Sequence, residues 1–149
     1  MTCLSAQIDR VFVVRWARPE TQDLTRIQSD IAAARARLRK PLLYVAIVPA
    51  DADPPEPDVR RAMIDSMGGV LEHCDAMYFA IEGTGFKHSV LRSALAGILL
   101  LAGRRGRVFV LTDAAQALQE AAHKTDASTV RLLAEARALG LLPAEAGTG

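Results

Sequence analysis

The chain has 149 residues, of which half are hydrophobic and 23% are charged, so its size and composition indicate one globular domain and exclude an intrinsically disordered protein. Its 18 Lys and Arg residues face 17 Asp and Glu residues, and the formal net charge of +1 gives no electrostatic reason to expect nucleic acid or an acidic membrane as a partner. The two cysteines, Cys3 and Cys74, lack the spacing of metal ligands and the pattern of a disulfide framework, which favours a reducing compartment.

Residues 1–10 lack the basic start and the following apolar run of a secretory signal peptide, so we expect no export by that route. The most apolar window, residues 90–103, is interrupted by Arg92 and is shorter than the roughly 20 residues that cross a bilayer. We therefore expect a cytoplasmic protein without a membrane span.

The first predicted strand covers residues 11–16, which are rich in β-branched and aromatic side chains. Apolar residues then recur at helical spacing from Thr21 to Leu38, and this pattern predicts an amphipathic helix that ends before Pro41. The nearly continuous apolar run of residues 42–48 predicts a central strand that is buried on both faces.

Residues 49–57 are rich in proline and predict a loop, because proline cannot donate a hydrogen bond to a helix or a sheet. A helix is predicted over residues 58–73, where Gly68 and Gly69 lower the helix propensity and suggest close packing against a neighbour. The acidic residues near this loop lack the spacing of a calcium-binding loop, and His73 beside Cys74 makes too small a set for a zinc site. We expect neither a metal nor a cofactor.

The third predicted strand, residues 76–81, runs directly into a loop at residues 82–89 and then into an apolar helix at residues 90–101. A fourth strand is predicted at residues 108–111. Two helices follow: the first has either Thr112 or Asp113 as its cap, and the second covers residues 126–139 and ends at Gly140.

This alternation of strands and helices predicts a mostly parallel sheet with right-handed crossovers. The sequence therefore predicts a single α/β domain over residues 11–142, with about four strands and a C-terminal helix. Residues 1–10 are interpreted as a lead-in, and residues 143–149 as a flexible tail.

The order of these elements over residues 11–122 resembles that of STAS-like domains, the fold of anti-sigma-factor antagonists. The resemblance is carried most by residues 75–122, where a strand, a loop that opens a helix, a second strand and an Ala/Leu-rich helix follow one another. It implies a regulatory function and a phosphorylatable residue in the loop. Ser89 stands nearest to that position, although it follows His88 and precedes Val90 where the family has an acidic and a small residue. Thr84 is the other candidate phosphosite.

The loop at residues 82–89 is the most distinctive feature of the sequence. Its Gly83-Thr84-Gly85 run lies between a strand and a helix, where free backbone N–H groups and the helix dipole can hold an anion. Neither a dinucleotide-binding fingerprint nor the ending of a P-loop is present, so a simple tight turn is the competing interpretation. Ser89 is similarly interpreted as a helix cap rather than as a nucleophile activated by His88.

We expect a non-enzymatic regulatory or protein-interaction module that acts through this loop and the following helix. The residues of the expected contact surface are Glu82, Gly83, Thr84, Gly85, Lys87, His88 and Ser89. The alternative is a small-ligand domain for an anion or a lipid, with Lys87 and His88 as polar contacts. A hydrolase that uses Ser89 or Thr84 ranks behind both, and the apolar helix at residues 90–101 would suit a homodimer.

Overall fold

The computed structural model describes residues 3–52, 55–83, 93, 97 and 107–143. Most of the loop predicted at residues 82–89, and nearly all of the apolar helix predicted after it, lie outside these residues. Most of the predicted flexible tail, residues 143–149, also lies outside the described residues. None of the described helices is long and apolar enough to cross a membrane.

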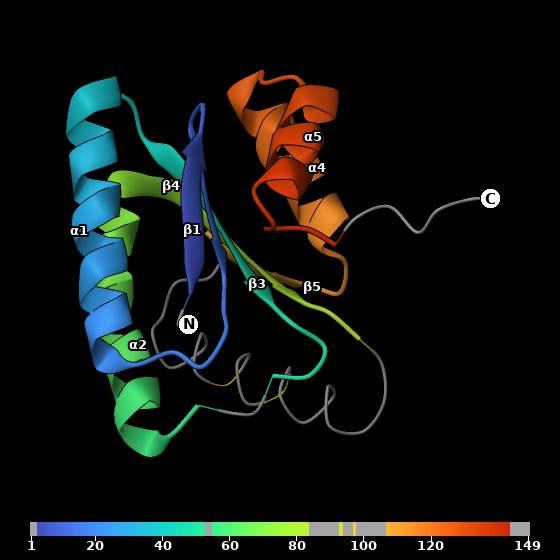
Figure 1. Cartoon of the computed structure of the whole chain (residues 1–149). Helices are drawn as coiled ribbons and strands as arrows, with labels where there is room; N and C mark the ends of the chain where they lie inside the picture. The colour runs from blue at the N-terminus through green and yellow to red at the C-terminus, as the bar shows by residue number, and fades with distance from the viewer. Residues whose placement is uncertain (1–2, 53–54, 84–92, 94–96, 98–106, 144–149) are drawn as a thin grey trace.

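A five-stranded sheet forms the centre of the molecule (Figure 1). Strand β1 pairs antiparallel with β2, and the pairs β2–β3, β3–β4 and β4–β5 are parallel. The α/β class with a mostly parallel sheet is therefore confirmed. In spatial order, which is also chain order, the strands are β1 (Leu4–Ile8), β2 (Val11–Arg15), β3 (Leu42–Val48), β4 (Cys74–Ile81) and β5 (Val108–Leu111).

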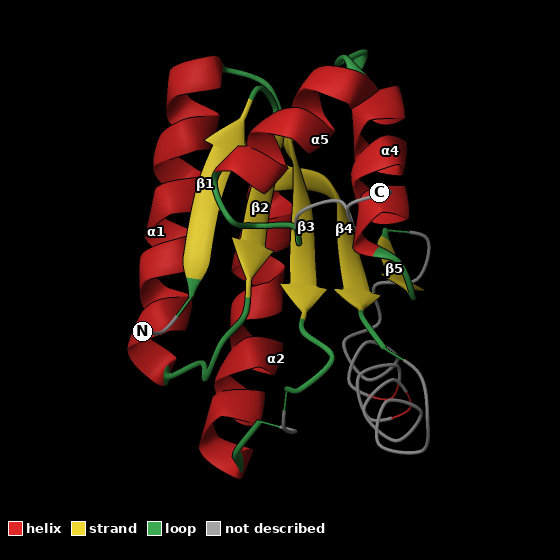
Figure 2. Ribbon diagram, turned by 45° about the vertical axis from the view of Figure 1, so that its right-hand side comes forward, coloured by secondary structure: helices red, strands yellow, loops and turns green. Residues whose placement is uncertain are grey.

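Helices cover both faces of this sheet, as Figures 1 and 2 show. The long helices α1 (Thr21–Leu38) and α2 (Pro57–His73) lie side by side on one face. The shorter helices α4 (Ala114–Thr125) and α5 (Thr129–Ala138) lie on the other. Each face thus has its own hydrophobic core, and the sheet separates the two.

The central strand β3 serves both cores because successive side chains of a strand point to opposite faces. Leu42, Tyr44 and Ala46 belong to the core under α1 and α2, whereas Leu43, Val45 and Ile47 belong to the core under α4 and α5. All six are buried. The prediction of a central strand buried on both faces is confirmed.

Strand β1 corrects the interpretation of residues 1–10 as a lead-in. Leu4–Ile8 pair with β2 along their whole length, and Asp9, with a φ of 53°, lies in the turn between the two strands. The inner side chain Ile8 is buried in the core under α4 and α5. The short mixed sequence of these five residues carries little strand propensity, and pairing with β2 stabilises the strand instead.

The C-terminal helices also differ in detail from their prediction. Asp113 caps α4, with its carboxylate accepting a hydrogen bond from the Ala115 N–H at 2.9 Å. Asp126 then adopts a left-handed conformation, with a φ of 56°, at the end of α4. Helix α5 therefore begins only at Thr129, where Ser128 is its cap, instead of at residue 126.

Arg107, just before β5, ties that strand to the end of α2. Its Nη2 donates to the carbonyl oxygens of Leu71 at 2.8 Å and Cys74 at 2.5 Å, and its Nε donates to that of Asp75 at 3.2 Å. These carbonyls lie at and just beyond the C-terminus of α2, where backbone acceptors lack intrahelical partners. The guanidinium satisfies them and also complements the negative end of the helix dipole.

Gly69 marks a close approach of α2 to α1. A Cβ atom built at this position would collide with the side-chain amide of Gln28 on α1. Close packing therefore explains this glycine, as its position inside a predicted helix suggested.

We predict that the effect of Gly69→Ala depends on Gln28. Alanine favours a helix by roughly 0.8–1 kcal/mol over glycine, but in the wild-type background the gain is offset by displacement of the Gln28 side chain. The coupling between the two positions is measured as a free energy of unfolding in urea, for Gly69→Ala, Gln28→Ala and the double variant. The stabilisation by Gly69→Ala should be larger in the Gln28→Ala background, and equal effects in both backgrounds would contradict the contact.

Candidate functional site

A hollow of about 250 Å³ lies at the carboxyl ends of the parallel strands β4 and β5. The walls come from the residues that follow β4, the start of α4 and the end of the described chain around α5. The lining residues are Glu82, Gly83, Thr112, Asp113, Ala114, Ala115, Arg137, Leu142 and Pro143.

Glu82 is fixed at the rim of this hollow by an ion pair. Its Oε1 lies 2.6 Å from Nη1 of Arg15, and the two side chains are only 21% and 24% exposed. The backbone N–H of Glu82 also donates to the Val48 carbonyl at 2.9 Å, which continues the parallel ladder past β4. The ion pair thus joins the ends of β2 and β4 across the end of β3.

Arg15 reaches a third part of the chain as well. Its Nη1 lies 3.4 Å from the carbonyl oxygen of Leu141, which precedes two residues of the hollow lining, Leu142 and Pro143. Leu141 and Leu142 are themselves buried in the core under α4 and α5. One guanidinium therefore positions two walls of the hollow relative to each other.

Gly83 follows Glu82 with a φ of 93°, a conformation that side chains with a Cβ rarely adopt. The chain turns here as it leaves β4. This conformation gives Gly83 a backbone reason to be glycine and agrees with the tight-turn interpretation of the loop's start.

The charges around the hollow are mixed. Glu82, Asp113 and Arg137 from α5 are the charged residues of its described lining. The Asp113 carboxylate accepts from the Ala115 N–H, so it occupies the N-terminus of α4, which would otherwise attract an anion. The Asp113 carboxylate therefore disfavours a simple anion at the N-terminus of α4.

Of the residues expected from the sequence, Glu82 and Gly83 lie in the hollow. Thr84, Gly85, Lys87, His88 and Ser89 lie outside the described residues. Thr112 and Asp113 were missed as site residues, although their place directly after a parallel strand was a usable signal. Arg137 gave no local signal, because only the packing of α5 brings it to this edge.

The cysteines are both free and buried. Burial raises the pKa of the Cys74 thiol to about 12 and also raises that of Cys3, so both thiols stay neutral near pH 7. His73 is the last residue of α2, as its position in the sequence predicted. Within the described ranges, no three His, Cys, Asp or Glu side chains are grouped so that they could hold a metal ion.

Comparisons with protein-family models, with curated proteins and with solved structures find no match for this chain. Its function is therefore inferred from the geometry of the hollow and from the residues that lead away from it.

We predict that Glu82→Gln destabilises the fold by about 1–2 kcal/mol, because it leaves the largely buried Arg15 guanidinium without its carboxylate partner. Glu135→Gln is the matched control. Glu135 pairs with Arg131 at 2.9 Å, but these side chains are 42% and 62% exposed, so its loss should change stability far less than the loss of Glu82. Urea unfolding checks both variants, and equal losses would show that burial of the Arg15 pair adds nothing.

Proposed function

We propose that the chain is a non-enzymatic regulatory module that binds a protein partner at the carboxyl edge of its sheet. The observation that carries this proposal is the anchored Glu82 at the rim of an open hollow, at the point where the chain leaves β4 for the predicted contact loop. A partner that approaches this loop would meet the hollow beside it.

The size and charge of the hollow support a protein side chain as its occupant. At about 250 Å³ it is smaller than most pockets that enclose a small molecule, which run from roughly 300 to 1,000 Å³. Asp113 is exposed at its wall and offers a carboxylate. A basic side chain of the partner would find an acceptor there, and the predicted loop would add contacts around it.

The STAS-like form is part of the same proposal. The resemblance places the partner-facing surface in the loop after the third predicted strand, and that loop begins at the hollow. The regulatory role, and phosphorylation of Ser89 or Thr84 as its switch, rest on the resemblance alone.

We predict that a photo-crosslinking residue in place of the exposed Thr112 captures a discrete protein in native cells. The control is the same residue in place of Val130, which is 79% exposed on α5 and does not line the hollow. Mass spectrometry identifies the captured protein. The proposal predicts one dominant product at position 112 that is absent at position 130. Identical products at both positions, or none at position 112, would refute it.

A small-ligand function for the same hollow is the second candidate. It is favoured by Arg137, which lines the hollow, and it is opposed by the Asp113 carboxylate at the start of α4. Lys87 and His88 would supply the further polar contacts, as the sequence predicts.

For this second candidate we predict a small molecule retained in the native mass spectrum of the purified chain. Arg137→Gln should lose the added mass, whereas Arg131→Gln on the exposed side of the same helix should keep it. An apo spectrum for the wild-type chain, including after incubation with inorganic phosphate, would exclude the small-ligand function for this hollow.

A further inference from the structure

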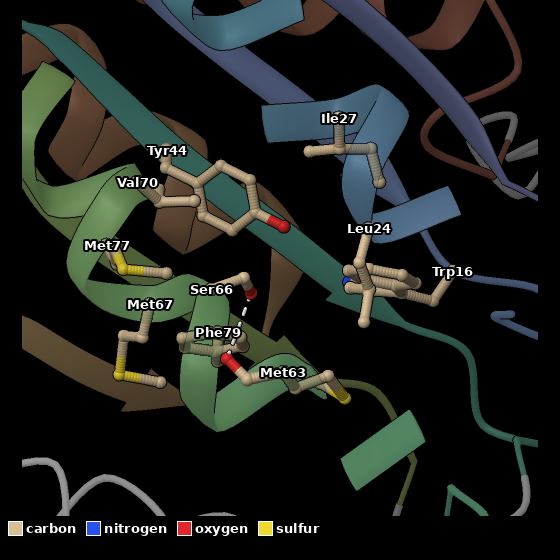
Figure 3. A pocket seen from close by; sticks show the side chains of 10 residues that line it. All are labelled: Trp16, Leu24, Ile27, Tyr44, Met63, Ser66, Met67, Val70, Met77 and Phe79. Carbon is tan, nitrogen blue, oxygen red and sulfur yellow. Dashed lines mark hydrogen bonds between the residues drawn. The ribbon is translucent and has the colours of Figure 1, made fainter. Parts of the chain in front are cut away.

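A second, partly open cavity lies under α1 and α2, in the other half of the molecule from α4 and α5. It has a volume of about 30 Å³. It is lined by side chains from α1, α2, β3 and β4, and by Trp16, which directly follows β2 (Figure 3). A space of this size holds one or two water-sized groups. It is separate from the hollow at the carboxyl edge, because the two have no described lining residue in common.

Trp16 supplies an unsatisfied hydrogen-bond donor to this cavity. Its side chain lines the space and is 5% exposed, and its indole Nε1 has no hydrogen-bond partner among the described residues. In Figure 3 the nitrogen lies on the side of the indole that faces the other lining side chains. A buried donor without an acceptor destabilises the fold, so an acceptor placed in the cavity would recover much of that loss.

Two hydroxyl groups point toward the same space, those of Tyr44 and Ser66 (Figure 3). Burial raises the pKa of Tyr44 well above its ordinary value, so its hydroxyl is neutral at physiological pH. Ser66 already donates to the Met63 carbonyl at 3.0 Å. Among the described residues, no charged side chain lines the cavity. An ionised ligand would therefore lose its hydration without gaining a counter-charge, whereas a neutral acceptor would not.

The remaining walls can adapt to a ligand. Met63, Met67 and Met77 line the cavity together with aliphatic and aromatic side chains. Methionine is unbranched and changes rotamer readily, so it can reshape a binding surface around different occupants. A cavity that holds a six-membered ring measures roughly 150 Å³, so these side chains would have to move to admit one.

We propose that this cavity is a binding site for a small, uncharged, mostly apolar molecule that carries one hydrogen-bond acceptor, such as a ketone. The acceptor bonds to the Trp16 Nε1–H, and the apolar part displaces the methionine side chains. This site would be independent of the partner surface at the carboxyl edge.

The test uses the indole N–H of Trp16, which gives a single resonance because the chain has one tryptophan. Cyclohexanone is titrated into ¹⁵N-labelled protein, and methylenecyclohexane serves as a probe of similar shape without a carbonyl oxygen. We expect cyclohexanone to shift the Trp16 indole proton downfield in a saturable manner. Methylenecyclohexane should shift it less and should not move it downfield.

Three variants test whether cyclohexanone binds in the cavity. Val70→Ile adds one methylene group to the lining and should weaken the saturable shift. Val59→Ile makes the same change on α2 in the same core but away from the cavity, and it should retain the shift. Ser66→Val is a second filling variant in case Val70→Ile perturbs the fold. The proposal is wrong if cyclohexanone leaves the indole resonance unchanged, or if the folded filling variants respond as the wild type does.

Discussion

The fold depends on one constraint, which is that the parallel strand β3 must be covered on both faces. Its six consecutive buried residues alternate between two separate cores. Parallel sheets meet this requirement with helices on each side, and here α1 and α2 cover one face while α4 and α5 cover the other. Because α4 and α5 follow the last strand, the end of the described chain is brought back over the carboxyl edge of the sheet, where it forms a wall of the hollow.

The polar groups at that edge are organised by a single guanidinium. Arg15 ends β2, pairs with Glu82 beyond β4 and reaches the Leu141 carbonyl, so three separate segments converge on one side chain. A largely buried ion pair of this kind contributes less net stability than its distance suggests, because both charges lose hydration. Its greater effect is to hold Glu82 in one position. A fixed carboxylate beside an open hollow suits recognition, which needs preorganised groups.

The elements with strong local patterns could be predicted from the sequence, and those held by distant contacts could not. The apolar periodicity of residues 21–38 and the apolar run of residues 42–48 determine α1 and β3 with little outside help. Strand β1 could not be predicted because its stability comes from pairing with β2. The predicted start of α5 lies three residues too early because the left-handed conformation of Asp126 has no distinctive sequence signal. In the site, Glu82 and Gly83 could be predicted because they follow a strand, whereas Arg137 enters only through tertiary packing.

The two contacts of Arg15 also bear on the order of folding. Arg15 and Glu82 are 67 residues apart in the chain, and Arg15 and Leu141 are 126 apart, whereas β1 and β2 are joined by a short turn. Contacts between distant residues form late, because the entropy of closing a long loop must be overcome before they stabilise anything. The β1–β2 hairpin can therefore form early, while the carboxyl edge takes shape only when both halves of the chain have come together. A partner that recognises this edge would distinguish the fully folded chain from its partly folded intermediates.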